Sequence, residues 1–488
     1  MKTVLASCLL LLLTCATSIA ARQTPAEKAA AIELLTQMVS ALNSRKEAPI
    51  RAFFEAHATD DIPIDMRVER MREFAEQGAP FKVEPDSAVT SDTIKATLVD
   101  RAGTRLSITL ATTGGLAPRL KSMRAMPART PGGPDRSLDD WKDLHDLTVK
   151  IATKRQAPAM SITVIRDGKQ ETAVTGVRKV DGKEAVGADE PWSIGSIGKP
   201  LCSTIIGMLI EQGRLRWEET LAEALTDVPM QEGYRAATIE QLMQHRGGIP
   251  QDGGFKMDRI REIVGDAKTP VAIRARYVRD ILNRAPIGKP GQRNAYSNAG
   301  YTLLGHIAER TTGKPYEQLV REMIFAPLGL KHSYTGADAL PDHRPSGHMK
   351  GPAGIKPLNM SGPMEYMFAP AGGGMWMSTA DLAQFGAEHL KGLHGKDGLL
   401  KAATVSRLHR GLLEGEGTFR YASGWGIESN PGIETFHGHN GSNGTFRAQL
   451  AIFPKANLVV AAIVNLGGEE EPSPGLEAVL AIARRFAH

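Results

Sequence analysis

One serine and one lysine of this chain have the spacing that could activate a hydroxyl group. Ser196 and Lys199 form the only Ser-x-x-Lys of the sequence, just before the apolar segment 201–210. Apolar residues recur in that segment at helical spacing, and positions i and i+3 of a helix share one face. A serine hydroxyl is a weak nucleophile until a neighbouring group takes its proton, which a partly desolvated lysine can do. The pair predicts nucleophilic catalysis, although a serine at a helix N-terminus is also a common cap.

A second group suited to proton transfer is Tyr296, in the only Tyr-x-Asn of the sequence. It lies between a turn at residues 289–291 and a helical segment at 300–311. A tyrosine can act as general base toward a serine hydroxyl when a lysine ammonium stabilises its phenolate. Asn298 could donate to a substrate carbonyl and hold the lysine. The structural alternative is a buried, hydrogen-bonded tyrosine at the start of a helix.

A third polar group, His439-Asn440-Gly441, lies near the C-terminus. Glycine turns flank it ahead of two apolar strands, so we expect His439 to line a sheet edge beside the nucleophile. There, a donor at His439 and the backbone N–H groups of Ser196 and Ser442 could bind a developing oxyanion.

The segment His437-Gly438-His439 also raises the question of a metal site. A zinc site needs three or four ligands, and the sequence offers no further ligand at suitable spacing and no cysteine cluster. We therefore expect neither a metal nor a cofactor.

Residues 1–21 have the pattern of a secretory signal peptide. Lys2 precedes an apolar stretch with leucines at positions 9–13, and small residues follow at 18–21. The apolar stretch is too short to span a bilayer stably. We expect an exported protein, periplasmic or secreted, without a stable membrane anchor.

Charge and cysteine content argue against a nucleic-acid-binding protein and against a disulfide-bonded one. The 488-residue chain carries a net charge of +5, with lysine and arginine spread along it and no basic stripe, so nucleic acid is not an expected partner. Outside the signal segment only Cys202 remains, which excludes an intrachain disulfide and predicts a small buried hydrophobe.

Composition divides the rest of the chain into two parts. A Pro- and Gly-rich linker at 129–136 separates residues 22–128 from residues 137–488. The first part is expected to be a small α+β domain, in which the lone His57 is structural. Its predicted helices are 27–42, 48–57 and 65–77, and its predicted strands are 81–89, 93–99, 105–111 and 120–126.

The second part has strands at both ends and a mostly helical middle. Asp167-Gly168 is a hairpin signal between strands at 160–165 and 171–177. Further strands are expected at 446–453 and 458–464, before a closing helix near 474–487. One sheet must therefore be assembled from distant parts of the chain.

The order Ser-x-x-Lys, Tyr-x-Asn and late His-x-Gly resembles the serine β-lactamase/penicillin-binding-protein superfamily. Within it, the chain is most similar to the class C β-lactamase, D-alanyl-D-alanine carboxypeptidase, D-aminopeptidase and esterase branch. The resemblance covers residues 137–488 and extends to the stretches 158–168, 207–221, 238–250, 316–333 and 371–385. It implies a β-lactamase/transpeptidase-like α+β fold, with an antiparallel sheet flanked by a helical region.

The resemblance also implies a role for each motif residue. Ser196 would be the nucleophile, and Lys199 and Tyr296 would share the proton transfer. The substrate-binding residues would be Asn298, His439, Gly441 and Ser442. His439 stands where β-lactamases usually carry lysine, so an esterase or peptidase is expected rather than an efficient β-lactamase.

The residues leave the substrate open. A small ester, a D-amino-acid amide or peptide, or a peptidoglycan stem would fit, and weak β-lactam hydrolysis is compatible with the motifs. The alternative is a penicillin-binding or sensor-type protein on the same fold with little or no turnover. Residues 22–128 resemble small cystatin-like or nuclear-transport-factor-like domains, and the sequence is silent on oligomeric state.

Overall fold

The computed structural model divides the chain into two units, Met1–Arg129 and Thr130–His488. The predicted signal segment and most of the predicted linker lie outside the residues that the structure describes. None of the described helices is long and apolar enough to cross a membrane. The described residues are 24–59, 64–85, 87–90, 92–101, 103–127, 136–250, 257–292, 294–336, 338–351, 354–358, 362–411, 419–430, 432–468 and 472–487.

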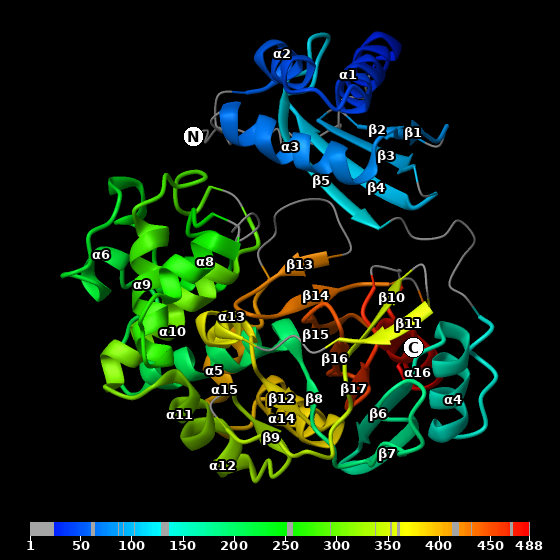
Figure 1. The fold of residues 1–488 in the computed structure, drawn as a ribbon, viewed down its shortest axis with the longest axis vertical. Helices are drawn as coiled ribbons and strands as arrows, with labels where there is room; N and C mark the ends of the chain where they lie inside the picture. The colour runs from blue at the N-terminus through cyan, green and yellow to red at the C-terminus, as the bar shows by residue number, and fades with distance from the viewer. Residues whose placement is uncertain are drawn as a thin grey trace, which may run out of the picture. The chain divides into compact units, whose positions relative to one another are not determined.

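The first unit packs three helices on an antiparallel sheet, which is the predicted α+β order (Figure 1). A capping box of Thr24 and Glu27 starts the first helix. Leu35, Phe54 and Leu98 are among the residues that close the core between helices and sheet. The elements are α1 (Pro25–Asn43), α2 (Glu47–His57), α3 (Ile64–Gly78), β1 (Lys82–Val83), β2 (Ala88–Val89), β3 (Thr93–Val99), β4 (Arg105–Thr112) and β5 (Leu120–Pro127).

The single strand predicted at 81–89 is wrong, because the structure has two short strands there. Both β1 and β2 pair with β3, and Pro85 lies between them. Proline has no backbone N–H to give to a ladder, so it interrupts the pairing.

The second unit is built on a seven-stranded antiparallel sheet in the order β13-β14-β15-β16-β17-β6-β7. The two ends of this unit's chain do meet in one sheet, as predicted, because β17 pairs with β6. Asp167 and Gly168 both have positive φ and form the predicted hairpin turn. The strands are β6 (Ala159–Arg166), β7 (Lys169–Gly176), β13 (Phe419–Tyr421), β14 (Gly426–Glu428), β15 (Phe436–Ser442), β16 (Arg447–Phe453) and β17 (Leu458–Val464).

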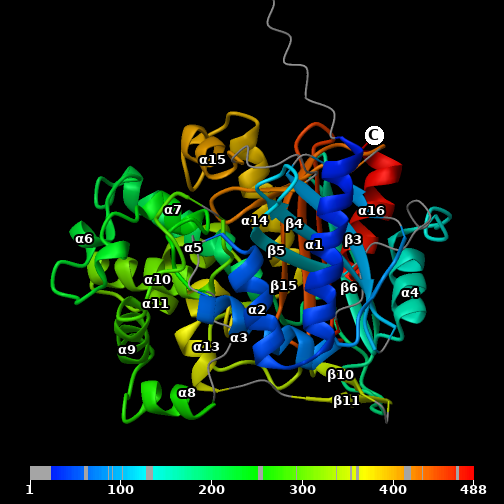
Figure 2. The same cartoon turned by 90° about the horizontal axis from the view of Figure 1, so that it is seen from above.

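Both faces of this sheet are buried. Alternate residues of β17 enter two different cores: Val460 packs with α4 (Leu144–Arg155) and α16 (Pro474–Phe486), and Val459 packs on the other side. This explains why the strand is apolar at every position. Figure 2 shows α4 and α16 on one side of the sheet, and α14 (Thr379–Leu393) with the helical region on the other.

The helical region fills the chain between β7 and β13. It contains α5 (Gly198–Glu211), α6 (Leu221–Ala224), α7 (Ile239–Met243), α8 (Met257–Val264), α9 (Pro270–Leu282), α10 (Asn298–Thr312), α11 (Tyr316–Val320), α12 (Ala326–Leu328), α13 (Pro363–Met367), α14 and α15 (Ala402–Leu408). The helices are connected by the short 3-10 turns η1 (Gly195–Ile197), η2 (Glu232–Tyr234) and η4 (Ala369–Ala371) and by the π-helical segment η3 (Arg321–Phe325). The connecting strands are β8 (Trp192–Ser193), β9 (Ser333–Tyr334), β10 (His348–Gly351), β11 (Gly354–Pro357) and β12 (Trp376–Met377).

Two arrangements fix the helices that carry the motifs. Strand β12 pairs with both β8 and β9, which brings the turn η1 after β8 next to the turn η4 before β12. The buried Arg274 of α9 donates to Glu309 of α10 and to Glu317 of α11, the latter through a 2.8 Å bond. A buried charge is tolerated when it is paired this completely.

A hydrogen-bonded chain of two buried histidines and the half-buried His437 runs from β15 to α5. Thr204 of α5 donates to the Pro200 carbonyl, so the 2.9 Å bond to His389 Nε2 must be donated by the imidazole. The proton positions then follow in order: His409 Nε2 donates to His389 Nδ1 over 3.1 Å, and His437 Nδ1 donates to His409 Nδ1 over 3.2 Å. This pattern requires His389 and His409 to be neutral, because each of them accepts a hydrogen bond at Nδ1.

Burial lowers the pKa of His389 to about 3 and of His437 to about 4, and holds the pKa of His409 well below 6.5. Nearby positive charge adds to the effect, from Arg420 on His437. Because the unfolded chain binds more protons at acid pH, this contribution to stability is complete above about pH 6.5 and is lost as the pH falls toward 4.

We predict that His437→Phe reduces the acid loss of stability. Removing one such group should lower the slope of unfolding free energy against pH, between about 6.5 and 4.5, by at most about 1.4 kcal/mol per pH unit. Urea unfolding of both proteins across this range gives the slopes. Equal slopes would show that His437 takes up a proton as readily in the folded protein as in the unfolded chain.

Candidate active site

Ser196 sits in the middle of the tight turn η1, at the start of α5. Gly195 has φ +51, in the left-handed region that favours glycine, and a Cβ there would overlap the backbone of Ser442. Gly372, with φ +112, packs its backbone against the Gly195 carbonyl in the same way. Ser196 is therefore held between two stretches of backbone, and its side chain stays partly exposed.

The side chain of Lys199 is fully buried next to Ser196. Its Nζ lies 3.1 Å from Ser196 Oγ, 2.7 Å from Asn298 Oδ1 and 3.1 Å from the Ala371 carbonyl oxygen. The predicted proximity of serine and lysine on one helical turn is thus what the structure shows. Because an N–H of Lys199 donates to Asn298 Oδ1, the Asn298 amide nitrogen remains a donor.

Tyr296 precedes α10 on a short loop, as predicted. Ser297 caps the helix by accepting from the Gly300 N–H over 3.1 Å, and Asn298 is the first helical residue. The Tyr296 ring centroid lies 4.6 Å from Lys199 Nζ and 4.4 Å from the ring of His245. The structure therefore brings Ser196, Lys199, Tyr296 and Asn298 together around one buried amine.

His439 lies on β15, where both of its ring nitrogens make hydrogen bonds. Its Nδ1 is 2.5 Å from the Asn440 carbonyl oxygen and must carry the proton, so Nε2 accepts from the Tyr421 hydroxyl over 3.0 Å. Burial, together with the charge of Lys199, lowers the pKa of His439 to about 3. His439 is thus neutral at neutral pH, and neither of its ring nitrogens is left as a donor to a substrate.

The backbone of Gly441 and Ser442 runs against the turn η1 that carries Ser196. A Cβ on Gly441 would overlap the Ile194 carbonyl and lie 2.9 Å from the Ser196 nitrogen. Glycine at 441 thus permits β15 to approach the turn. The expected sheet edge is wrong, because β13 and β14 continue the sheet beyond β15.

Three contributors to the site were not anticipated from the sequence. The Ala371 carbonyl reaches Lys199 because Gly372 lets η4 approach η1, and the Gly372-Gly373-Gly374 run was the available signal. Tyr421 belongs to a three-residue strand whose pattern is too short to recognise. His245 follows α7, far from both motifs in sequence.

The described residues contain no group of three or more His, Cys, Asp or Glu side chains placed to hold a metal ion. His437 joins the histidine chain, and His439 contacts Tyr421. Cys202 is buried on α5 as predicted, and burial raises the pKa of its thiol to about 12, so it is an unreactive neutral group.

We predict that Gly441→Ala disables the site with little effect elsewhere. The added methyl must push β15 away from the turn η1. This should lower the rate at which a fluorophosphonate labels Ser196 by about tenfold or more. Gly351→Ala, where the nearest atom to the new Cβ is 3.9 Å away, is the matched control. Equal labelling of all three proteins would contradict the role of this close approach.

Comparisons with known proteins cover most of the second unit. A family model described as Beta-lactamase matches residues 144–484. The chain is 27% identical over 338 residues to penicillin-binding protein 4 of Amycolatopsis lactamdurans, covering 67% of this chain and 85% of that protein. It is 23% identical over 224 residues to a putative D-alanyl-D-alanine carboxypeptidase of Escherichia coli O157:H7, covering 42% of this chain and 50% of that protein.

Solved structures show the same fold. An octameric penicillin-binding protein homologue from Pyrococcus abyssi superposes with a TM-score of 0.57 at 25% identity, over 70% of this chain and 76% of that one. A D-stereospecific amidohydrolase from Streptomyces gives a TM-score of 0.57 at 20% identity, over 71% and 98% of the two chains. The match over residues 144–484 shows that the chain belongs to the β-lactamase family of serine hydrolases.

Proposed function

We propose that this protein is an exported hydrolase of esters or amides that acts through an acyl-enzyme on Ser196. The observation that carries the proposal is the buried Lys199 amine, held by Ser196, Asn298 and Ala371. In the neutral amine, two N–H groups satisfy the Asn298 and Ala371 oxygens, which can only accept. The lone pair then faces the Ser196 hydroxyl, which is the geometry of a general base.

Acylation uses the groups around this amine. The Ser196 hydroxyl gives its proton to Lys199 or to the phenolate of Tyr296 while Oγ attacks the substrate carbonyl carbon. We propose that the backbone N–H groups of Ser196 and Ser442 bind the oxyanion that develops. The leaving alcohol or amine takes the proton as its bond to the carbonyl breaks, and water then hydrolyses the acyl-enzyme.

We predict that Ser196→Ala abolishes both fluorophosphonate labelling and turnover, because it removes the hydroxyl that lies 3.1 Å from the Lys199 amine. Turnover should fall by about a thousandfold or more. Ser203→Ala removes a buried hydroxyl from the same helix, 3.3 Å from the Tyr301 hydroxyl, and should be labelled like the wild type. Intact mass spectrometry and ester hydrolysis are the measurements.

The outcomes separate the proposal from its alternative. An adduct on wild type without any product release would indicate a penicillin-binding or sensor-type protein. Turnover by Ser196→Ala equal to the wild type would exclude Ser196 as the nucleophile.

We further propose that the substrate is uncharged next to the scissile bond on its leaving-group side. A lysine at position 439 would attract a substrate carboxylate, whereas His439 is neutral and has both ring nitrogens bonded. An unpaired carboxylate beside it would be costly to desolvate. The D-stereospecific amidohydrolase and D-amino-acid amidase structures share this fold, which supports small amides as candidates.

We predict that a D-alanyl-D-alanine amide is hydrolysed with a kcat/KM at least about tenfold higher than the free acid. His439→Lys should lower the ratio of the two kcat/KM values or invert it, because the lysine places a positive charge where the substrate carboxylate would lie. Tyr421→Phe removes a hydroxyl that bonds His439 without adding charge, and should keep the preference. A wild-type preference for the free acid would contradict the proposal while leaving the Ser196 mechanism intact.

A further inference from the structure

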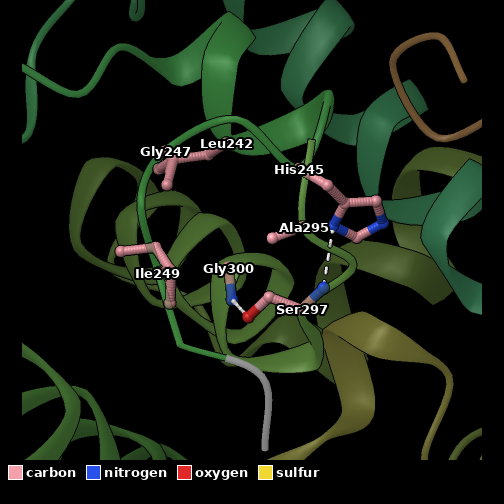
Figure 3. A pocket seen from close by; sticks show the side chains of 7 residues that line it. All are labelled: Leu242, His245, Gly247, Ile249, Ala295, Ser297 and Gly300. Atoms are coloured by element: carbon pink, nitrogen blue, oxygen red, sulfur yellow. Dashed lines mark hydrogen bonds between the residues drawn. The ribbon is translucent and has the colours of Figure 1, made fainter. Parts of the chain in front are cut away.

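His245 links the loop after α7 to the loop that carries Tyr296. Its backbone has φ +57, and its carbonyl accepts from the Ala295 N–H over 2.8 Å. Its ring Nδ1 accepts from the Ser297 N–H over 3.1 Å, which is the dashed bond in Figure 3. Asn294 adds a 2.8 Å bond to the Gln244 carbonyl. The two loops are thus bonded on both sides of Tyr296.

The proton of the His245 imidazole can be placed from these bonds. Because a backbone N–H donates to Nδ1, that nitrogen carries no hydrogen, and the neutral ring holds its proton on Nε2. Burial, followed by the positive charge of Lys199, holds the pKa of His245 well below its usual range, so the ring stays neutral. His439 faces it as well and is itself neutral.

The Nε2–H of His245 is a buried donor without a hydrogen-bond partner among the described residues. In Figure 3 it lies on the side of the ring away from Leu242, Gly247 and Ile249. The imidazole is packed between three tyrosines, with centroid distances of 4.4 Å to Tyr296, 4.7 Å to Tyr421 and 5.2 Å to Tyr301. A buried donor left unpaired is destabilising, so its retention here calls for a physical reason.

We propose that His245 is a positioning residue of this active site, which holds the Tyr296 ring against Lys199 and fixes the loop before Asn298. Its Nδ1 sets the loop, and its ring forms the wall behind Tyr296. Its Nε2–H supplies a fixed dipole beside the phenolate that forms when Tyr296 gives up its proton. The inference rests on the proposed hydrolase function.

His245→Asn is the variant that tests this role. Asparagine tolerates positive φ, and its Oδ1 can still accept from the Ser297 N–H, but the ring and the Nε2–H are lost. We expect kcat to fall by about tenfold or more with KM changed by less than about threefold, and the pH profile of fluorophosphonate labelling to shift. His306→Asn, at another buried histidine on α10, should lower only thermal stability.

A double-mutant cycle shows whether His245 acts through Tyr296. In a Tyr296→Phe background, His245→Asn should have almost no further effect on kcat, because the group it positions is gone. Additive losses, or a wild-type pH profile in His245→Asn, would overturn the proposal. Absence of labelling in the wild type would instead overturn the hydrolase function itself.

The proton position is testable in the unmodified protein, even where the variants fail to fold. Nitrogen-15 NMR of labelled histidines should find one imidazole that stays in the neutral Nε2–H form from about pH 8 to pH 5 and couples to the Ser297 segment. A protonated ring or an Nδ1–H form at this position would exclude the proposed arrangement.

Discussion

The buried amine of Lys199 is the constraint around which the second unit is arranged. A fully buried lysine amine must find its hydrogen-bond partners within the protein, and here the partners come from three separate segments: Ser196 on η1, Asn298 on α10 and Ala371 on η4. Each segment has its own support. The pairing of β12 with β8 joins η4 to η1, and the buried Arg274 ties α10 to its neighbours.

Two neutral imidazoles lie close enough to that amine to feel its charge. His439 is fixed by the Tyr421 hydroxyl and by the Asn440 carbonyl, and His245 is held by the Ser297 N–H. Burial near Lys199 disfavours a second positive charge, so these rings act through shape and dipoles. The site thereby combines one basic amine, that of Lys199, with the polar but uncharged rings of His245 and His439.

Local patterns predicted the parts of the fold that depend on neighbouring residues in sequence. The helix after Ser196, the hairpin at Asp167-Gly168 and the apolar strand β17 all follow from periodicity and turn chemistry. The prediction failed at Pro85, which has no backbone N–H for the ladder and divides the one expected strand into two. The three-residue strand with Tyr421 carries too little pattern to be recognised.

The sequence by itself determined which residues could carry the proposed chemistry, because Ser196 and Lys199 share one turn of a helix and Tyr296 and Asn298 share one loop, so their pairwise spacing is local. Only the tertiary structure decided how these pairs meet and what faces them. The Ala371 carbonyl, the tautomer of His439 and the contact of His245 with Tyr296 each join residues far apart in sequence. Such contacts depend on backbone approach at glycines and on the pairing of distant strands, which no local pattern records.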